Sequence, residues 1–270
     1  MVELNNEILR EAEYAHYDFQ SGVYFTDSKI IDNGLILWNT VIDDVFWNYA
    51  TKVNISSDKF DDFIEIVKKF FISINRKPSV YVTPFTVTRN VEDELLKSGF
   101  KANYKDAWMF YEYDNVKLEI PKDFVIKKVE SEKELEIFLE VFDKAYGNPD
   151  DVYNDMDNAG YIQCIKESFK RNKDFYFLGY FKNKPVSISV LSFNEKYAGI
   201  YTVGTIPKER GNGFGTILTL KCVDEAMKMG IKVIFLQTEQ GSYNEKYYDN
   251  IGFKTKFIGT GYVFEGESNE

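Results

Sequence analysis

The sequence predicts an α+β protein of two tandem lobes, each a mixed, mostly antiparallel sheet flanked by helices. The first observation is an internal repeat, in which residues 95–101 recur in kind as residues 248–254, each copy with a Gly-Phe pair. The second is that the same offset of 153 residues aligns residues 80–82 with residues 233–235. The third is a series of strand-like and helix-like patterns in the second half, typical of a sheet wrapped by a few helices.

The first lobe is predicted to span residues 1–118. Apolar side chains with a 3.6-residue period over residues 60–74 indicate an amphipathic helix. Ser56 or Ser57 supplies its N-cap, and Asp58 lies in its first turn. A strand, a short helix ending before the Gly-Phe pair, a further strand, a turn and a last strand complete this copy.

The second lobe is predicted to span residues 119–270. Its elements are a strand at 125–129, helices at 132–146 and 158–171, strands at 175–181, 186–193 and 198–205, a long helix at 213–229, a strand at 233–238, a short helix at 243–250 and a closing strand pair. The short polar segment 182–185 indicates a β-hairpin, and Gly230 marks the end of the long helix.

Composition and charge bound the class of protein. Hydrophobic residues make up 44% and charged residues 28% of the chain, the balance of a soluble globular protein. No apolar run approaches the ~20 residues that cross a bilayer, and the acidic N-terminus does not resemble a signal peptide. The formal net charge of −10 argues against nucleic acid as a partner. An acidic surface serves solubility, or alternatively attracts a cationic amine.

Cysteine and histidine usage excludes several kinds of site. Cys164 and Cys222 lie in helix-like patterns without metal-ligand spacing, and His16 is the single histidine. We therefore expect no disulfide scaffold, no metal and no Cys–His dyad. The same usage favours a reducing, cytoplasmic location.

A glycine-rich turn is the clearest candidate binding site. Gly211, Gly213 and Gly215 lie between the strand at 198–205 and the long helix. Glycines let the backbone approach a ligand closely, and the free N–H groups of a helix N-terminus bind anions such as phosphate. Thr216 stands where the dinucleotide fingerprint needs its last glycine, and the P-loop lysine is absent. A tight structural connection without a ligand is the alternative.

At this turn the sequence resembles the GNAT superfamily of N-acetyltransferases. The superfamily signature is Arg or Gln, two residues, Gly, one residue, and then Gly or Ala, which Arg210, Gly213 and Gly215 satisfy. Downstream, Tyr248 followed by Gly252-Phe253 is similar to a second motif of the superfamily. The order of strands and helices from residue 125 onward also fits.

The resemblance implies acetyl-CoA as the acyl donor. Its pyrophosphate would lie on the backbone N–H groups of the glycine turn, and its pantetheine arm would run beside the preceding strand end like an added strand. The thioester would lie where the two central parallel strands separate. The residues implied for acetyl-CoA are Val203, Gly204, Thr205, Arg210, Gly211, Asn212, Gly213, Phe214, Gly215 and Thr216.

The resemblance also implies a general acid. Tyr248 matches the tyrosine that protonates the departing thiolate of CoA in this superfamily, and a phenol pKa of about 10 suits that role. A tyrosine that only packs in the core is the alternative. Tyr247 is the fallback, because adjacent helix residues face about 100° apart and only one of the pair can point at the sulfur.

Candidates for the general base are carboxylates. Many members of the superfamily carry a glutamate on the strand before the glycine turn, but residues 198–205 contain none. Glu239, at the end of the strand at 233–238, is the nearest candidate, with an ordinary loop acid as the alternative. Further acids, which either recognise a cation or form a solvated loop, lie between the first two helices of the second lobe: Asp150, Asp151, Asp155 and Asp157.

The first lobe lacks the residues of the glycine turn. At the positions of Arg210 and the three glycines it has Ser57, Asp58, Phe60 and Asp62. Leu95 replaces the tyrosine. We therefore expect a degenerate GNAT-like lobe that binds no CoA and walls part of the acceptor cleft.

Together these features predict an acetyl-CoA-dependent N-acetyltransferase with one active lobe. Its acceptor would be a primary amine of a small molecule or peptide, and its partners would include neither nucleic acid nor membrane. For the oligomeric state, the sequence leaves both a monomer and a homodimer open. A non-catalytic acyl-CoA-binding or regulatory module is the alternative. Aminoacyl transfer from tRNA is disfavoured by the intact glycine turn and the net charge of −10.

Overall fold

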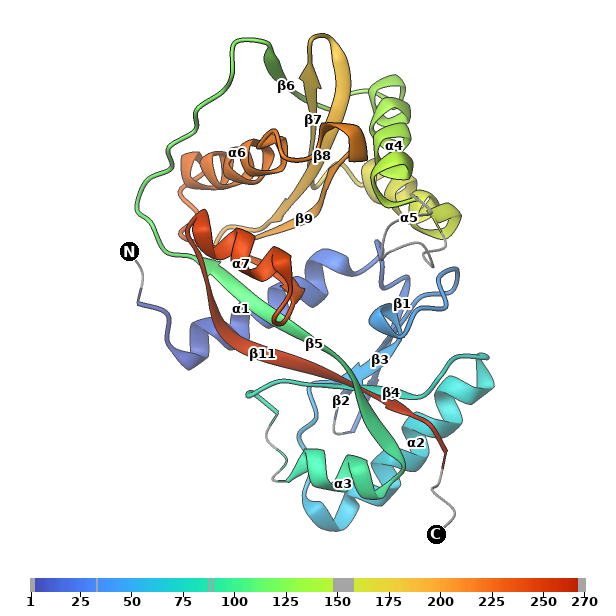
Figure 1. Ribbon diagram of the computed structural model, residues 1–270. Coiled ribbons are helices and arrows are strands. Elements are labelled where there is room, and N and C mark those ends of the chain that lie inside the picture. The colour runs from blue at the N-terminus through green and yellow to red at the C-terminus, as the bar shows by residue number, and fades with distance from the viewer. Residues whose placement is uncertain (1–2, 33, 87, 89, 148–157, 267–270) are drawn as a thin grey trace.

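The computed structural model describes residues 3–32, 34–86, 88, 90–147 and 158–266 (Figure 1). Its strands are β1 (Asp27–Ile31), β2 (Gly34–Trp38), β3 (Tyr49–Thr51), β4 (Ser79–Val82), β5 (Phe100–Tyr111), β6 (Phe124–Lys128), β7 (Phe175–Phe181), β8 (Lys184–Phe193), β9 (Tyr197–Thr205), β10 (Val233–Glu239) and β11 (Phe253–Phe264). Its helices are α1 (Asn6–Gln20), α2 (Phe60–Ser73), α3 (Val91–Lys97), α4 (Glu132–Tyr146), α5 (Asn158–Lys170), α6 (Phe214–Lys228) and α7 (Tyr243–Asn250).

One sheet runs through both lobes. Its strand order is β1-β2-β3-β4-β11-β5-β10-β9-β8-β7-β6. Among the described strands the pairs β3·β4 and β9·β10 are parallel, and the other neighbouring pairs are antiparallel. The predicted α+β class, with two tandem lobes and a mixed, mostly antiparallel sheet, is confirmed.

The internal repeat corresponds to repeated elements. β5 and β11 have 12 residues each, and their first residues, Phe100 and Phe253, are separated by the offset found in the sequence. α3 and α7 precede these strands, and α2 and α6 hold the equivalent place before β4 and β10. The predicted boundary between residues 118 and 119 falls between β5 and β6. It remains a prediction, because the sheet is continuous across it.

The two lobes exchange their last strands. β5, from the first lobe, pairs with β10 of the second lobe, with Asp106 opposite Glu239. β11, from the second lobe, pairs with β4 of the first lobe, with Tyr262 opposite Val80. Between them β5 and β11 pair antiparallel along their lengths, as the long crossing ribbons of Figure 1 show.

This exchange corrects one expectation. A closing strand pair joined by a turn was expected in each copy, whereas each copy ends in one continuous strand. The place that a second strand of the pair would fill is taken by the long strand of the other lobe. The backbone groups of both long strands therefore find ladder partners without a turn.

Helix α1 and the strands β1 to β3 were not placed from the sequence. The Asn5 side chain accepts a hydrogen bond from the Ile8 N–H at 3.0 Å and so caps α1. Leu9, Ala12 and Phe19 then pack in one cluster with second-lobe residues of β10. Because this helix belongs to the first lobe by sequence, the cluster joins the lobes through apolar burial.

Local sequence signals define two features of the second lobe. Ser131 and Glu134 form a capping box at the start of α4, in which the Ser131 Oγ accepts from the Glu134 N–H at 3.3 Å. Lys182 and Asn183 connect β7 to β8 with φ of 47° and 63°. Two residues with positive φ are the requirement of a tight hairpin turn, so the β-hairpin is confirmed.

Side chains on β8 show which helix covers which face. Ile188 and Val190 pack in the cluster that contains Phe142 of α4. Ser189 lies between these two residues in the sequence, and its Oγ forms a 3.3 Å hydrogen bond with the Cys222 sulfur of α6. Because successive strand residues point to opposite faces, α4 and α6 cover opposite faces of the sheet.

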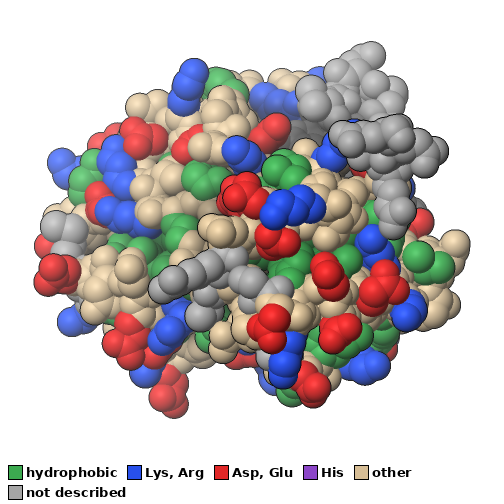
Figure 2. Space-filling model, turned by 90° about the horizontal axis from the view of Figure 1, so that it is seen from below, with side chains coloured by type: hydrophobic (Ala, Val, Ile, Leu, Met, Phe, Trp, Pro, Cys, Tyr) green, Lys and Arg blue, Asp and Glu red, His purple; other side chains and the backbone are tan. Residues whose placement is uncertain are grey.

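Charged side chains are interspersed on the surface. Figure 2 shows acidic and basic groups side by side over the end of the molecule formed by α2 and α3. Ion pairs there include Lys69 with Glu65 and Lys97 with Glu94. Within the described residues, no helix is long and apolar enough to cross a bilayer.

Candidate functional site

The glycine turn has the backbone of an anion site. Gly211 and Gly213 have φ of 82° and 77°, a region that side chains disfavour, and a Cβ atom at either position would meet no atom within 4 Å. Gly213 is the N-cap of α6. Within the described part of the chain, no hydrogen-bond acceptor faces the backbone N–H groups of Phe214, Gly215 or Thr216. The turn therefore offers free N–H groups to open space at the positive end of a helix.

The side chains around the turn hold it in place. Phe214 is buried and stacks on Phe124, with ring centroids 4.6 Å apart, so only its backbone faces outward. The Arg210 guanidinium donates from Nε to the Thr205 carbonyl at 3.1 Å and from Nη2 to the Ala145 carbonyl at 2.9 Å. Arg210 therefore ties the end of β9 to the end of α4 while its charge remains at the mouth of the turn.

The two central parallel strands separate beside the turn. β9 and β10 are paired only where residues 197–199 meet residues 233–235, although both strands continue beyond that point. On β9 the chain bulges at Thr202, which has φ of 53°, and the register with β8 shifts between Ile188 and Val190. A positive φ at a β-branched residue is a strained backbone of the kind that clusters at functional sites. No sequence signal pointed to Thr202.

Val203, Gly204 and Thr205 follow this bulge. A Cβ atom on Gly204 would lie 3.0 Å from the Tyr146 ring and 3.1 Å from Ala145, so glycine lets α4 pack closely on β9. The Tyr146 hydroxyl donates to the Val203 carbonyl at 2.9 Å. The strand end is therefore held against α4 at the place where a pantetheine arm was expected to pair.

The two candidate tyrosines of α7 have different surroundings. The Tyr247 hydroxyl lies 3.0 Å from the Thr216 Oγ1, and a Cβ atom on Gly215 would lie 3.3 Å from it. Burial raises the pKa of Tyr247 above its ordinary value. Tyr248 packs against the core with Phe253, at a ring-centroid distance of 6.1 Å. The Tyr247 hydroxyl therefore lies at the glycine turn, whereas the ring of Tyr248 packs on the core beside it.

The predicted base, Glu239, is exposed at the end of β10 and lies opposite Asp106 of β5. Asp106 was not singled out from the sequence, because only the exchange of strands brings it here. It is buried, and its Oδ2 accepts from the Tyr81 hydroxyl at 3.0 Å. The acids Asp150, Asp151, Asp155 and Asp157 lie outside the described residues.

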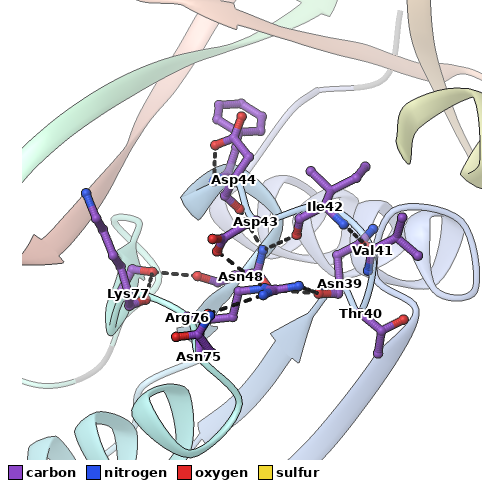
Figure 3. Close-up of polar contacts among 12 residues, drawn as sticks. Asn39, Thr40, Val41, Ile42, Asp43, Asp44, Asn48, Asn75, Arg76 and Lys77 are labelled. Carbon is purple, nitrogen blue, oxygen red and sulfur yellow. Dashed lines mark hydrogen bonds and ion pairs between the residues drawn. The ribbon is translucent and has the colours of Figure 1, made fainter. Parts of the chain in front are cut away.

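A loop of the first lobe, residues 39–48, braces the second lobe and is itself held by the polar contacts drawn in Figure 3. Asn39 Oδ1 accepts from the N–H groups of Val41 and Ile42, each at 2.7 Å. Arg76 donates to the Asn39 carbonyl at 3.2 Å, a bond drawn in Figure 3. From this loop the Trp47 Nε1 donates to the Tyr161 hydroxyl of α5 at 2.8 Å.

The equivalent of the glycine turn in the first lobe is closed. A short 3-10 helix, Ser57–Lys59, leads directly into α2. Phe60, at the position of Gly213, is 1% exposed and packs in the core of the lobe. No φ from 57 to 62 is in the left-handed region among the described residues.

A separate groove lies away from this site. Its volume is about 680 Å³, and its lining includes residues 110–114 at the end of β5 and residues 230–234 at the start of β10. Glu239 and the separation of β9 from β10 are at the other end of β10. This groove is therefore not part of the site around the glycine turn.

Comparisons with known proteins agree with this geometry. The model of the acetyltransferase (GNAT) family matches residues 135–253. An uncharacterized N-acetyltransferase of Methanocaldococcus jannaschii is 24% identical over 216 residues, which is 75% of this chain and 88% of that protein.

Solved structures show the shared fold. A GCN5-related N-acetyltransferase from Kribbella flavida matches with a TM-score of 0.68 and 17% identity, over 94% of this chain and 95% of that one. A tandem GNAT protein from the clavulanic acid biosynthesis pathway matches with a TM-score of 0.56 and 9% identity, over 86% and 78%. The second match shows the same fold in a chain with two GNAT lobes.

Proposed function

We propose, from the match of residues 135–253 to the model of the acetyltransferase (GNAT) family, that the protein transfers an acetyl group from acetyl-CoA to a primary amine. The observation that carries the proposal is the turn at Gly211 and Gly213, whose backbone and free N–H groups suit a pyrophosphate. The acceptor is a small molecule or a peptide. Two free, buried cysteines fit a reducing, cytoplasmic location.

The donor would be held along β9 and the start of α6. The N–H groups from Gly211 to Thr216 would bind the pyrophosphate, and the strand end at Val203 to Thr205 would border the pantetheine arm. The thioester would then lie where β9 and β10 separate. The Val203 carbonyl accepts from the Tyr146 hydroxyl and has a second lone pair for an N–H group of the arm.

The reaction needs an acid and a base. A neutral amine attacks the thioester carbonyl, a C–N bond forms, and the C–S bond breaks as the thiolate leaves. We assign the acid to Tyr248, with Tyr247 as the second candidate, and the base to Glu239. The acid supplies the proton that the thiolate takes, and the base accepts the proton that the amine loses.

Calorimetry and a thiol-release assay test the proposal together. We expect acetyl-CoA to bind once per chain, because Phe60 closes the equivalent place in the first lobe. We expect CoA thiol to be released with at least one amine of a panel of aliphatic, aromatic and peptide primary amines. Binding without release for every amine would favour the non-catalytic module, and two sites per chain would contradict the assignment of the first lobe.

A further inference from the structure

The exchange of strands places a first-lobe carboxylate in the second-lobe site. Asp106 of β5 lies opposite Glu239 of β10, and opposite residues of an antiparallel pair point to the same face with Cβ atoms about 5 Å apart. Asp106 also shares that face with Trp108, two residues along the strand. The pair lies at the end of β10 that has separated from β9.

Asp106 has the contacts of a carboxylate that lacks a cation. It is 4% exposed, and its Oδ2 accepts from the Tyr81 hydroxyl at 3.0 Å. That hydroxyl accepts in turn from the Trp108 Nε1 at 2.9 Å, so its own proton is directed at Asp106. Among the described residues, no donor reaches the other oxygen, and no lysine or arginine pairs with the carboxylate. A buried charge of this kind is costly unless a cation arrives.

Glu13, a second buried carboxylate, has a different set of contacts. Its Oε1 accepts from Tyr17 at 2.6 Å, and its Oε2 accepts from Thr83 at 3.1 Å. Lys52 also interacts with it electrostatically. Both oxygens of Glu13 are therefore bonded inside the protein, as expected of a structural group, whereas one oxygen of Asp106 is left for a ligand.

Aromatic rings surround the Asp106 carboxylate. Tyr81 lies between Tyr49 and Tyr104, with ring centroids 5.1 Å and 6.1 Å away. Phe46 of the bracing loop lies 4.9 Å from Tyr104, and both of these rings are partly exposed. An alkylammonium group is attracted both by the negative charge of a carboxylate and by the faces of aromatic rings, so this arrangement suits such a group.

Burial raises the pKa of Asp106 to about 7, and the charge of Glu239 adds to this increase. The hydrogen bond from Tyr81 acts in the opposite direction and lowers that pKa. The titratable groups that face Asp106 are Tyr81 from β4, Tyr49 from β3, Tyr104 from β5 and Glu239 from β10. A carboxylate with this pKa takes up a proton near neutral pH.

We propose that Asp106 and Glu239, one from each lobe, form a carboxylate pair that binds the ammonium group of the acceptor and accepts its proton. This rests on the proposed acetyl transfer. One ammonium N–H bond breaks, its proton goes to the carboxylate pair, and the neutral amine attacks the thioester carbonyl. The second proton that the nitrogen loses as the C–N bond forms replaces the proton that the acid gives to the departing thiolate. The first lobe thus supplies part of the acceptor site, and the acceptor is an amine that is cationic at neutral pH.

The test is the pH profile of kcat/KM for an amine found in the panel. In the native protein kcat/KM rises with pH, with a midpoint near 7, and then levels off. Asp106→Asn keeps the shape and the acceptor atom for Tyr81. We expect it to lower kcat/KM by a factor on the order of 10² to 10⁴, with a rise that continues to the pKa of the free amine. Its acetyl-CoA dissociation constant stays within about twofold, because no change is made at the glycine turn.

Further variants separate this role from a structural one. Glu239→Gln should lower kcat/KM, because one member of the pair is lost, and should also move the midpoint to lower pH, because the charge of Glu239 raises the pKa of Asp106. Tyr81→Phe should move it to higher pH, since the hydroxyl lowers that pKa. Asp106→Glu should recover part of the activity. Glu195→Gln, on the exposed turn before β9, is the matched control and should change nothing.

The outcomes distinguish this inference from the proposed function. Native turnover with an unchanged profile in both Asp106→Asn and Glu239→Gln would overturn the carboxylate pair and leave acetyl transfer intact. The carboxylate pair would also be overturned if Asp106→Asn lowered only the stability of the protein and left the midpoint of the pH profile of kcat/KM unchanged. Failure of the native protein to release thiol with any amine would overturn the proposed function and this inference with it.

Discussion

Residues of the site differ in how far the sequence alone could place them. Gly213 was found because a strand, a glycine turn and a helix follow each other in the chain, so the signal is local. Asp106 was missed because its partners, Glu239 and Tyr81, come from other strands and meet only through the exchange. Thr202 was missed because a bulge depends on the register with β8. Local chemistry was thus predictable, and side chains brought together by long-range pairing were not.

The glycine turn supports a prediction with a matched control. Gly213→Asp should weaken acetyl-CoA binding roughly 100-fold or more, because a carboxylate within about 4 Å of the pyrophosphate repels it by several kcal/mol. Gly230→Asp is the control, since Gly230 also has a positive φ, 83°, and open space around its Cβ position. Calorimetry should show native affinity for the control. Equal losses in both variants would mean that backbone strain, and not the phosphate site, accounts for the effect.

Tyr248 and Tyr247 make a second pair for comparison. If Tyr248 protonates the thiolate, Tyr248→Phe should lower kcat by a factor on the order of 10² to 10⁴ with little change in acetyl-CoA affinity. The loss should shrink for donors whose thiol leaves without a proton. Tyr247→Phe removes a hydroxyl bonded to Thr216 and should then mainly affect binding. The reverse pattern in the two variants would transfer the role of acid to Tyr247.

At the scale of elements, amphipathic periodicity identified the helices and the strands of the second lobe, because those patterns are contained in one segment each. α1 carried the same signal, with Asn5 as cap and apolar residues at Leu9, Ala12 and Phe19, and could have been found. The exchange of β5 and β11 could not have been found from the sequence. Pairing within a lobe and pairing between lobes satisfy the same alternation of side chains along these strands. The expected hairpin was wrong for this reason.

The bracing loop at residues 39–48 allows a prediction about stability. Asn39 is buried, accepts from two backbone N–H groups and donates to the Tyr24 carbonyl at 2.7 Å. Asn39→Ala should lower the free energy of unfolding by about 2–4 kcal/mol, because buried backbone groups lose their partners. Thr40→Ala, at the exposed neighbouring position, should change it by less than about 0.5 kcal/mol. Urea unfolding measures both, and a small effect of Asn39→Ala would mean that the loop is not a brace.

At the scale of the whole molecule, the two lobes share one sheet, and we expect them to unfold as one unit. The sheet is continuous, α1 of the first lobe packs on β10, and each lobe's last strand pairs with the other lobe. Separation would leave β10 and β4 with exposed edges and uncover the aromatic cluster around Phe235. The first lobe, which lacks the glycine turn, therefore contributes a strand and a helix to the packing of the lobe that carries the turn.

This coupling can be measured with the natural fluorophores. All of the tryptophans, Trp38, Trp47 and Trp108, lie in the first lobe, whereas the glycine turn lies in the second. If the lobes unfold together, acetyl-CoA at 100 times its dissociation constant should raise the free energy of the tryptophan-detected transition by about 2.7 kcal/mol. Independent lobes would leave that transition unmoved, because the ligand would stabilise only the lobe without tryptophan. Gly213→Asp should abolish the increase while keeping one transition, which separates loss of binding from loss of coupling. Two transitions, with the tryptophan signal unaffected by ligand, would show that the shared sheet does not unite the lobes.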